Sequence, residues 1–472
     1  MNALASFAPI LVLSLGSLGY LLGTKTIEKL RIGAALAAIL IAVAAWFSVG
    51  LVESAPVVRY GLSITSFSKL MCLVACCGAF VSVIATASSL EKEGITTVSE
   101  YYYLTISSLC GALIMIFASD FLTLFIGVEV ASLALYCLCG ARVTSRRSSE
   151  ASMKYFLLGC FSSACLLYGI AAWYGATGSL VIAKSNALIA HGPLMALSFI
   201  LILVGIAFKI GLAPFHFWVP DVYQGSPTSV TTFMSCVVKV AAVAALVKIS
   251  SSAFGYSEIW SSGSLWILSM VAMTVGNLAA LQQKSVKRML AYSSVAQAGY
   301  MMIGLAVAGQ GTGSIAATIF YLMTYCAMTV GAFGVLSVMG PDVDDVQDLR
   351  GLSKRSPFLA LAKTLFFLGL AGLPPSLAGL MGKVYLFSSA IAAKYYGLAI
   401  VAALNSALAC AYYVRVPIAI YFQPSDGASR VTVSRGAVLA LAACAVAVVV
   451  FGLLPETLLV AAREAAAAVG RS

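Results

Sequence analysis

The chain of 472 residues is 61% hydrophobic and only 10% charged, and it carries a formal net charge of +11. Soluble domains contain about 25% charged residues, so this composition excludes a water-soluble globular protein and indicates a polytopic membrane protein. The positive charge does not indicate a nucleic-acid partner, because the Lys and Arg residues concentrate in alternate loops between apolar segments.

The apolar segments predict an all-α membrane protein with about fourteen transmembrane helices, because one helix crosses the hydrocarbon core in about 20 residues. The first segment lacks the basic start and the cleavage site of a signal peptide, so we expect a retained helix there. The expected spans are 5–23, 32–53, 61–88, 100–119, 120–140, 150–174, 196–218, 228–249, 263–283, 287–308, 312–340, 357–391, 396–422 and 434–455.

Basic residues divide unequally between the loops that join these spans. The odd-numbered loops, counted from the N-terminus, hold fifteen Lys and Arg residues. Cytoplasmic loops carry the excess of Lys and Arg, so we expect the odd loops in the cytoplasm and both termini on the opposite side. The even-numbered loops and the C-terminal tail hold only six: Arg59, Lys184, Lys248, Lys394, Arg463 and Arg471.

Two interruptions rich in Gly and Pro divide otherwise continuous apolar runs. They lie in Gly205–Trp218 and in Gly369–Lys383, about 160 residues or five helices apart. Proline removes a helical hydrogen bond, and paired interruptions at matching positions are typical of transporters built from inverted repeats. We therefore predict four parts: helices 1–3 in 1–99, a first five-helix repeat (helices 4–8) in 100–249, an inverted second repeat (helices 9–13) in 250–422, and helix 14 with a tail in 423–472.

Glu129 is the single acidic side chain deep inside an apolar run, about ten residues from either end of its span. A buried carboxylate is either protonated or paired with a cation. Two interpretations stay open: a neutral acid in a helix–helix hydrogen bond, or a proton-exchanging site tuned by a nearby lysine. Lys209 and Lys239 lie centrally in their spans, and a buried lysine, unlike an arginine, can gain and lose a proton.

Two further groups lie near the interruptions. Lys383 follows the second interruption and is the deep titratable cation of the second half. His216 lies seven residues after Lys209, and it is either a structural side chain or a proton relay to that lysine. Hydroxyl groups, including those of Tyr321 and Tyr325, could bridge distant lysines with water, or they could serve only as packing contacts between helices.

The depth of the remaining basic residues is less clearly defined by spacing. Lys154 lies only seven residues after Arg147, so it either extends to the cytoplasmic interface or pairs with Glu129. Lys69, Lys363 and Arg415 lie within a few turns of a predicted helix end, and we expect their side chains to extend to the interface.

No pattern in the sequence indicates a bound cofactor or metal. The twelve cysteines include no CxxC pair, and His191 and His216 are the only histidines, so no Cys/His cluster for zinc, haem or iron–sulfur is expected. A phosphate loop, a catalytic triad and a dinucleotide fingerprint are also missing, which excludes ATPases, hydrolases and NAD sites.

The motif Lys209–Ile–Gly–Leu–Ala–Pro–Phe–His–Phe–Trp–Val–Pro–Asp–Val–Tyr–Gln–Gly–Ser–Pro–Thr228 resembles the subunit N family, one of the three antiporter-like subunit families of proton-translocating NADH–quinone oxidoreductase (respiratory complex I). Phe125–Glu129, Glu150–Tyr155, Val286–Ser294 and Leu370–Pro374 with Gly382–Lys383 also match. Tyr321 and Tyr325 stand where histidine would be expected in the paralogous families L and M.

The resemblance implies a role for each candidate residue. Glu129 and Lys154 would form a modulating pair, Lys209 would be the channel lysine of the first half, Lys239 the connecting lysine and Lys383 the exit-side lysine. NADH, FMN, iron–sulfur clusters and quinone would lie in other subunits. The neighbours would be subunit M on one side and subunits A, J and K on the other, in a bacterial inner membrane with both termini periplasmic and lipid around the helices.

Three alternatives compete with this interpretation. A subunit of a multisubunit cation/proton antiporter or of a membrane-bound hydrogenase would share the broken helices and the lysines. A stand-alone secondary transporter would take up a solute when it is reconstituted alone. A structural membrane spacer would tolerate substitution of Lys209 or Glu129 without loss of proton pumping.

Overall fold

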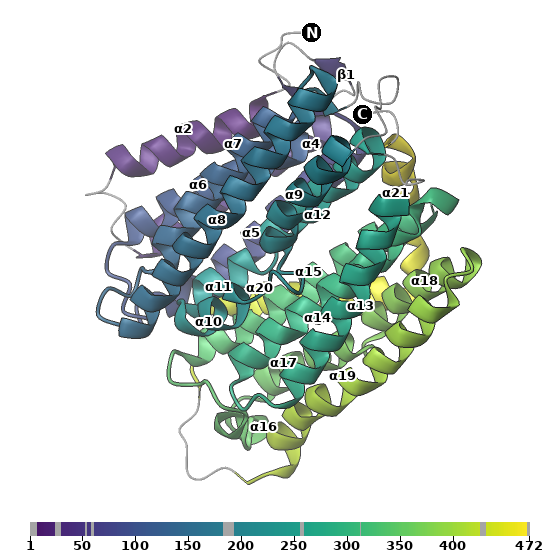
Figure 1. Cartoon of the computed structure of the whole chain (residues 1–472). Coiled ribbons are helices and arrows are strands. Elements are labelled where there is room, and N and C mark those ends of the chain that lie inside the picture. The colour runs from purple at the N-terminus through teal and green to yellow at the C-terminus, as the bar shows by residue number, and fades with distance from the viewer. Residues whose placement is uncertain are drawn as a thin grey trace.

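The computed structural model describes residues 7–23, 30–51, 54–57, 61–182, 193–254, 259–311, 313–424 and 431–469. Eleven helices in these ranges are long and apolar enough to cross a membrane. A helix or a pair of helices overlaps each of the fourteen expected spans (Figure 1), so the predicted polytopic helical fold is confirmed. Arg59, Lys184, His191 and Arg471 lie outside the described residues.

The spans follow one another with short connections. The first three are α2 (Ala8–Leu22), α4 (Leu30–Gly50) and α5 (Ser66–Thr86). The next five are α6 (Val98–Phe117), α7 (Phe121–Cys139), α8 (Arg146–Thr177), the pair α9 (Pro193–Ile210) and α10 (Trp218–Gly225), and the pair α11 (Thr228–Met234) and α12 (Val237–Lys248). The last six are α13 (Ile259–Leu281), α14 (Val286–Ala306), α15 (Gly313–Met339), the pair α17 (Pro357–Ala371) and α18 (Leu377–Ala392), α19 (Tyr396–Phe422) and α20 (Arg435–Leu453).

Both predicted interruptions are confirmed, and they have the same local geometry. Gly211 follows α9 with φ of 79°, and Gly372 follows α17 with φ of 82°, a conformation that favours glycine. In each case the next amide donates to a carbonyl five residues earlier: Leu212 to Ala207, and Leu373 to Leu368. This glycine cap ends the first half-helix, and the prolines that follow prevent the helix from continuing.

The first helix pair of each predicted repeat is packed through glycine. A Cβ on Gly111 of α6 would lie 2.3 Å from the amide nitrogen of Ala131 on α7. A Cβ on Gly276 of α13 would lie 2.6 Å from the amide nitrogen of Ala296 on α14. The matching close contacts and the matching breaks support an internal repeat, whose residue boundaries stay a prediction.

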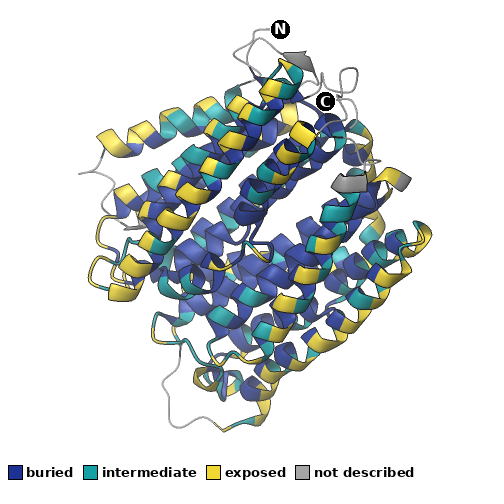
Figure 2. Ribbon diagram, viewed as in Figure 1, coloured by how far each residue is buried: buried dark blue, intermediate teal, exposed yellow. Residues whose placement is uncertain are grey.

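Burial is greatest in two central spans. The apolar windows of the segment Thr228–Ala253 and of α15 are 100% and 94% buried. Figure 2 shows the exposed residues on the outer faces of the surrounding helices, and these residues include Trp46, Phe161 and Phe422. Large exposed apolar side chains on the outer surface are expected where lipid replaces water.

A C-terminal helix, the short helix α16 (Leu352–Arg355) and a small hairpin are among the elements that were not predicted from the sequence. Residues after 455 were expected to form a tail, but α21 (Pro455–Val469) is a helix that packs on α5 and α15. Its alanine-rich sequence has too little hydropathy to indicate a span, although Leu459, Ala462 and Ala466 are buried at helical spacing. The small hairpin is antiparallel and consists of β1 (Ser54–Val57) and β2 (Leu62–Ile64).

Candidate functional site

Lys209 lies in the last turn of α9, immediately before the first break, and only 3% of it is exposed. Its ammonium donates to the hydroxyls of Ser132 at 2.7 Å and Tyr136 at 3.2 Å, both on α7. The same nitrogen lies 5.7 Å from the ring centroid of Tyr155 on α8, within cation–π range. Hydroxyls and ring faces therefore surround this cation.

Glu129 lies on the same side of α7 as Ser132, because residues three apart are neighbours on a helix surface. It is half-buried and accepts a hydrogen bond from the hydroxyl of Ser163 on α8. The carboxylate and the lysine therefore both bond serines on the surface between α7 and α8.

The structure does not bring Lys154 into contact with Glu129, and the modulating role of the two residues stays a prediction. The Lys154 ammonium instead bonds Glu150 at 2.7 Å and Asp221 of α10 at 2.8 Å. Ser163, which contacts Glu129, lies nine residues further along α8, or about 13 Å along the helix axis. The spacing argument for a position near the helix end is therefore the correct one, and 42% of this lysine side chain is exposed.

Asp221 also bonds Arg288 at 2.6 Å, which joins α8, α10 and α14 in one charged cluster. The cluster lines a small recess of about 190 Å³. Asp221 was not singled out as a site residue, although an acidic side chain shortly after the first break could have indicated it.

Lys239 of α12 lies at the centre of the molecule and bonds one residue of α14 twice. Its ammonium donates to the backbone carbonyl of Ser294 at 2.7 Å and to the hydroxyl of the same residue at 2.5 Å. The hydroxyl of Tyr325 on α15 also donates to Ser294 Oγ, at 3.2 Å. The structure therefore brings Tyr325 into contact with the predicted connecting lysine.

Lys383 of α18 bonds the broken end of the preceding half-helix. Its ammonium donates to the carbonyl of Ala371, the last residue of α17, at 2.7 Å, and to Ser406 Oγ on α19 at 3.0 Å. A cation at a helix C-terminus is stabilised by the helix dipole. The ring centroid of Tyr300 lies 5.0 Å from the same nitrogen.

Gln297 connects these two lysine sites, and sequence analysis missed it. It lies one turn after Ser294 on α14 and donates to the carbonyl of Leu370 at 2.9 Å. Leu370 precedes Ala371, the residue that Lys383 binds. Tyr321 donates its hydroxyl to Gln297 Oε1. Polar groups thus lie between Lys239 and Lys383, and an amide in the middle of a membrane-spanning helix was the signal that could have revealed Gln297.

His216 lies in the break between α9 and α10 and is buried. Its ring stacks on Phe217 at a centroid distance of 5.0 Å and lies 6.2 Å from the ring of Tyr292. The hydrogen bonds of Lys209 go to α7, so the structure does not join this histidine directly to that lysine. A relay role for His216 stays a prediction.

Two lysines that were expected near the membrane surface are buried. Lys363 was expected to extend to the interface, but it is fully buried and donates to the carbonyl of Ala332 on α15 at 2.9 Å. Lys248 was assigned to a loop, but it donates to the carbonyl of Ile116 at 2.6 Å, at the C-terminal end of α6. Lys69 and Arg415 reach the backbone carbonyls of Leu51 and Leu281.

Lys248→Ala is expected to reduce stability without reducing the proton-transfer activity of the protein that does fold. The substitution leaves the carbonyls of Ile116 and Ala118 without this donor, which costs about 1–3 kcal/mol when the acceptors are buried. The thermal midpoint and the yield of purified protein measure this loss. A variant with wild-type stability would contradict the capping role.

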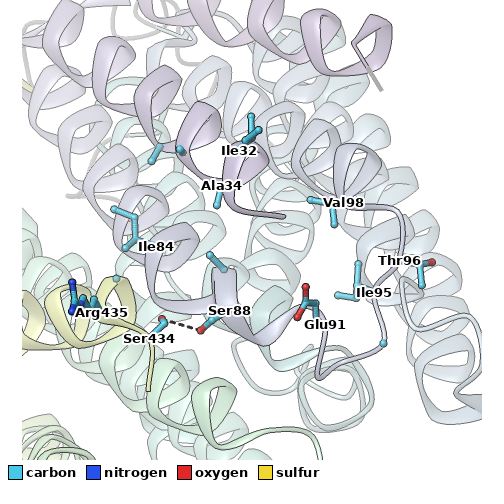
Figure 3. A pocket seen from close by; sticks show the side chains of 15 residues that line it. Ile32, Ala34, Ile84, Ser88, Glu91, Ile95, Thr96, Val98, Ser434 and Arg435 are labelled. Carbon is cyan, nitrogen blue, oxygen red and sulfur yellow. Dashed lines mark hydrogen bonds between the residues drawn. The ribbon is translucent and has the colours of Figure 1, made fainter. Parts of the chain in front are cut away.

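The described residues contain no group of three or more His, Cys, Asp or Glu side chains that could hold a metal ion. A cavity of about 1480 Å³ lies between α4, α5 and α20, and the site lysines do not line it (Figure 3). Each site lysine instead forms hydrogen bonds to protein groups around it.

Comparison with known proteins gives consistent matches. Residues 118–409 match the family model described as NADH:quinone oxidoreductase/Mrp antiporter, TM. The chain is 40% identical over 445 residues to NADH-quinone oxidoreductase subunit N of Trichlorobacter lovleyi, covering 89% of this chain and 90% of the relative. It is 42% identical over 411 residues to subunit N 1 of Sorangium cellulosum, covering 83% and 80%.

Solved structures agree in fold. A chain of respiratory complex I from Thermus thermophilus superposes with a TM-score of 0.82 at 35% identity, covering 96% of this chain and 98% of that chain. A chain of the Mrp complex from Dietzia sp. superposes with a TM-score of 0.85 at 21% identity, covering 99% and 98%. The second likeness concerns the fold alone.

Proposed function

The chain belongs to the NADH:quinone oxidoreductase/Mrp antiporter membrane family, and from this we propose that it is the proton-translocating subunit N of NADH–quinone oxidoreductase. The observation that carries the proposal is the series of buried lysines, Lys209, Lys239 and Lys383, placed on the two broken spans and between them. Burying a charge in a membrane protein is costly, and lysines retained there are typical of ion pathways.

The proton path runs through hydroxyl, amide and lysine groups. Lys209 receives a proton in the first half, where Glu129 lies on the same side of α7 as its partner Ser132. The proton then moves laterally to Lys239, whose partner Ser294 also contacts Tyr325. From there Gln297 and Tyr321 lead to the carbonyl groups beside Lys383. Exit from Lys383 delivers the proton to the outer side.

Control of this path would begin at Glu129, which lies on the same side of α7 as Ser132, the partner of Lys209. A conformational or charge signal from quinone reduction would then alter the interaction of Glu129 with Lys209. Lys154 belongs to the charged cluster with Asp221 and Arg288 and would respond to movement of α10 relative to α8 and α14. Each exported charge costs about 2.3 kcal/mol per 100 mV, so a redox drive is required.

The redox chemistry lies outside this chain in the proposed complex. NADH, FMN, iron–sulfur clusters and quinone bind to partner subunits, and this chain contributes the proton path. Subunit M would contact one side of the chain, and subunits A, J and K the other. The complex would lie in a bacterial inner membrane with both chain termini in the periplasm, as the excess of Lys and Arg in the odd loops indicates.

The nearest alternative is a subunit of a multisubunit cation/proton antiporter, because that class shares the fold. The identity of about 40% to subunit N over most of the chain favours complex I. Genes for the other complex I subunits beside this gene would support the proposal, and genes for antiporter subunits would support the alternative.

Lys209→Ala tests the proposal in a complex purified with all subunits and reconstituted in liposomes. We expect NADH–quinone turnover and proton uptake to fall about tenfold, since a positioned proton-transfer group contributes at least that factor. Residual transfer through water beside Ser132 and Tyr136 would account for the remaining rate. Unchanged turnover and uptake in an intact complex would make this lysine a buried structural charge and would contradict the proposal.

A further inference from the structure

A second carboxylate is buried more deeply than Glu129, and the path described above does not use it. Glu93 lies in the connection between α5 and α6 and is only 1% exposed. Its neighbours Glu91, Lys92 and Gly94 are exposed. Of the charged side chains in this short loop, the Glu93 carboxyl turns inward while Glu91 and Lys92 are exposed.

The partners of Glu93 come from two central spans. Ser229 of α11 donates its hydroxyl to Glu93 Oε2 at 2.5 Å and its amide to Oε1 at 3.2 Å. Ser337, near the end of α15, donates to Oε1 at 3.5 Å. Burial raises the pKa of the Glu93 carboxyl above its ordinary value, against the Ser229 hydrogen bond and the positive charges of Lys287 and Arg142. The carboxyl is thus set to exchange a proton closer to neutrality than an exposed glutamate.

Ser229 begins a polar stretch that leads towards Lys239. Five of the eight residues from 228 to 235 carry hydroxyls, and all five are at most 1% exposed: Thr228, Ser229, Thr231, Thr232 and Ser235. A hydroxyl row of this kind is unusual at the centre of a membrane protein, where each polar group needs a partner. This hydroxyl row spans most of the sequence between Ser229, the partner of Glu93, and Lys239.

The two ends of this stretch connect to the groups already described. Thr231 donates to the carbonyl of Tyr223 at 3.2 Å, and the phenol of Tyr223 interacts with Ser294, the partner of Lys239. Near the other end, the hydroxyl oxygen of Thr228 is buried and has no hydrogen-bond partner among the described residues. A buried hydroxyl in such a position is usually satisfied by water.

The loop that carries Glu93 borders open space. Glu91, Gly94, Ile95 and Thr96 line the cavity of about 1480 Å³ between α4, α5 and α20, and Figure 3 shows the Glu91 side chain beside it. The cavity therefore borders the outer side of the loop, while the Glu93 carboxyl contacts the polar stretch on its inner side. By the distribution of basic loops, this is the cytoplasmic side.

We propose that Glu93 is a proton-uptake group that passes protons from the cytoplasmic side along the hydroxyl row of α11 to Lys239. This inference rests on the proposed function and adds an entry point to it. In one transfer the O–H bond of the Glu93 carboxyl breaks, the proton moves over hydroxyls and water, and an N–H bond forms at neutral Lys239. The Glu93 carboxylate left behind then takes up a proton from solvent and returns to its neutral form, and no electrons are exchanged.

Glu93→Gln tests the inference in the complete complex reconstituted in liposomes. Glutamine keeps the size and the acceptor oxygen but cannot ionise, so a hydrogen-bonding role survives and a proton-exchanging role does not. We expect NADH–quinone turnover and proton uptake, each per assembled complex, to fall about tenfold or more. Glu91→Gln, two residues away and exposed, is the matched control and should behave as wild type.

The other outcomes are also informative. Turnover and uptake in Glu93→Gln equal to those in Glu91→Gln would overturn the relay role. If Glu93→Gln fails to assemble, Ser229→Ala is the deciding variant, because it keeps the carboxylate and removes its hydroxyl contact. Slowed turnover in Ser229→Ala would support the inference, and normal turnover would contradict it. Lys239→Met in the same assay distinguishes a failure of this inference from a failure of the proposed function. An unaffected Lys239→Met complex would contradict the proposed function itself.

Discussion

Lys239→Met is expected to abolish nearly all coupled activity of the complex. Lys239 is the titratable group at the centre, and both the lateral step from Lys209 and the step towards Lys383 pass through it. Methionine retains most of the side-chain volume and removes the charge, so packing changes little. Loss of a positioned proton-transfer group lowers the rate by about 10²–10⁴, and NADH–quinone turnover with proton uptake in liposomes would measure this loss.

Lys363→Met is the matched control for Lys239→Met. Lys363 is also fully buried, and its ammonium lies 4.6 Å from the ring centroid of Phe367, but its hydrogen bond goes to a backbone carbonyl of α15. This lysine has no place in the proposed path. Equal losses of turnover in the two variants would show that any buried lysine is needed for the fold, and the special role of Lys239 would be refuted.

Gly379→Ala is expected to prevent correct assembly of the second broken span. A Cβ at this position would lie 1.8 Å from the carbonyl oxygen of Gly369 on the other half-helix. The two nearest atoms, the carbonyl oxygen and carbon of Gly369, belong to the backbone of α17, so α17 and α18 must separate. Overpacking of a core costs about 1–3 kcal/mol even when side chains can move, and the backbone atoms in this clash can move less than side chains. The amount of intact complex in the membrane would measure the effect.

Gly397→Ala provides the comparison for Gly379→Ala. A Cβ on Gly397, in the first turn of α19, would meet nothing within 4 Å. Alanine also favours a helix over glycine by about 1 kcal/mol. We expect normal or slightly improved assembly there. Normal assembly of Gly379→Ala would mean that the two half-helices pack less closely than the structure indicates.

The fold followed from the sequence because local chemistry determines it. Hydropathy located the fourteen spans. Gly211 and Gly372 and the prolines that follow them located both breaks, because each of these residues restricts its own backbone conformation. The short helix α21 was missed because alanine gives little hydropathy. Its position is determined by packing on α5 and α15, which no local pattern contains.

The candidate site was predicted in part. Lys209, Lys239 and Lys383 were recognised because a charge inside an apolar run is visible in the sequence, and all three are buried. Their partners depend on which helices pack together. The loop around Glu93 has the composition of a solvent-exposed turn, and only contacts with α11 and α15 bury its carboxylate.

The position of Lys154 illustrates the same limit. Sequence spacing placed it near the end of its helix, whereas the family resemblance paired it with Glu129. In this structure Lys154 contacts Asp221 of α10, a contact that depends on how α10 packs after the first break. Neither sequence spacing nor family resemblance contained that partner, and the functional role of Lys154 stays a prediction.

The central claim is that a defined series of buried lysines carries protons, and two variants compared side by side test it most directly. Lys239→Met and Lys248→Ala each remove one lysine that is 3% exposed, one in the proposed path and one that caps α6. The measurement is proton uptake and NADH oxidation recorded together, per intact complex, in the same liposomes. The account predicts loss of both activities in Lys239→Met and retention of both in Lys248→Ala. Full activity in Lys239→Met would contradict it.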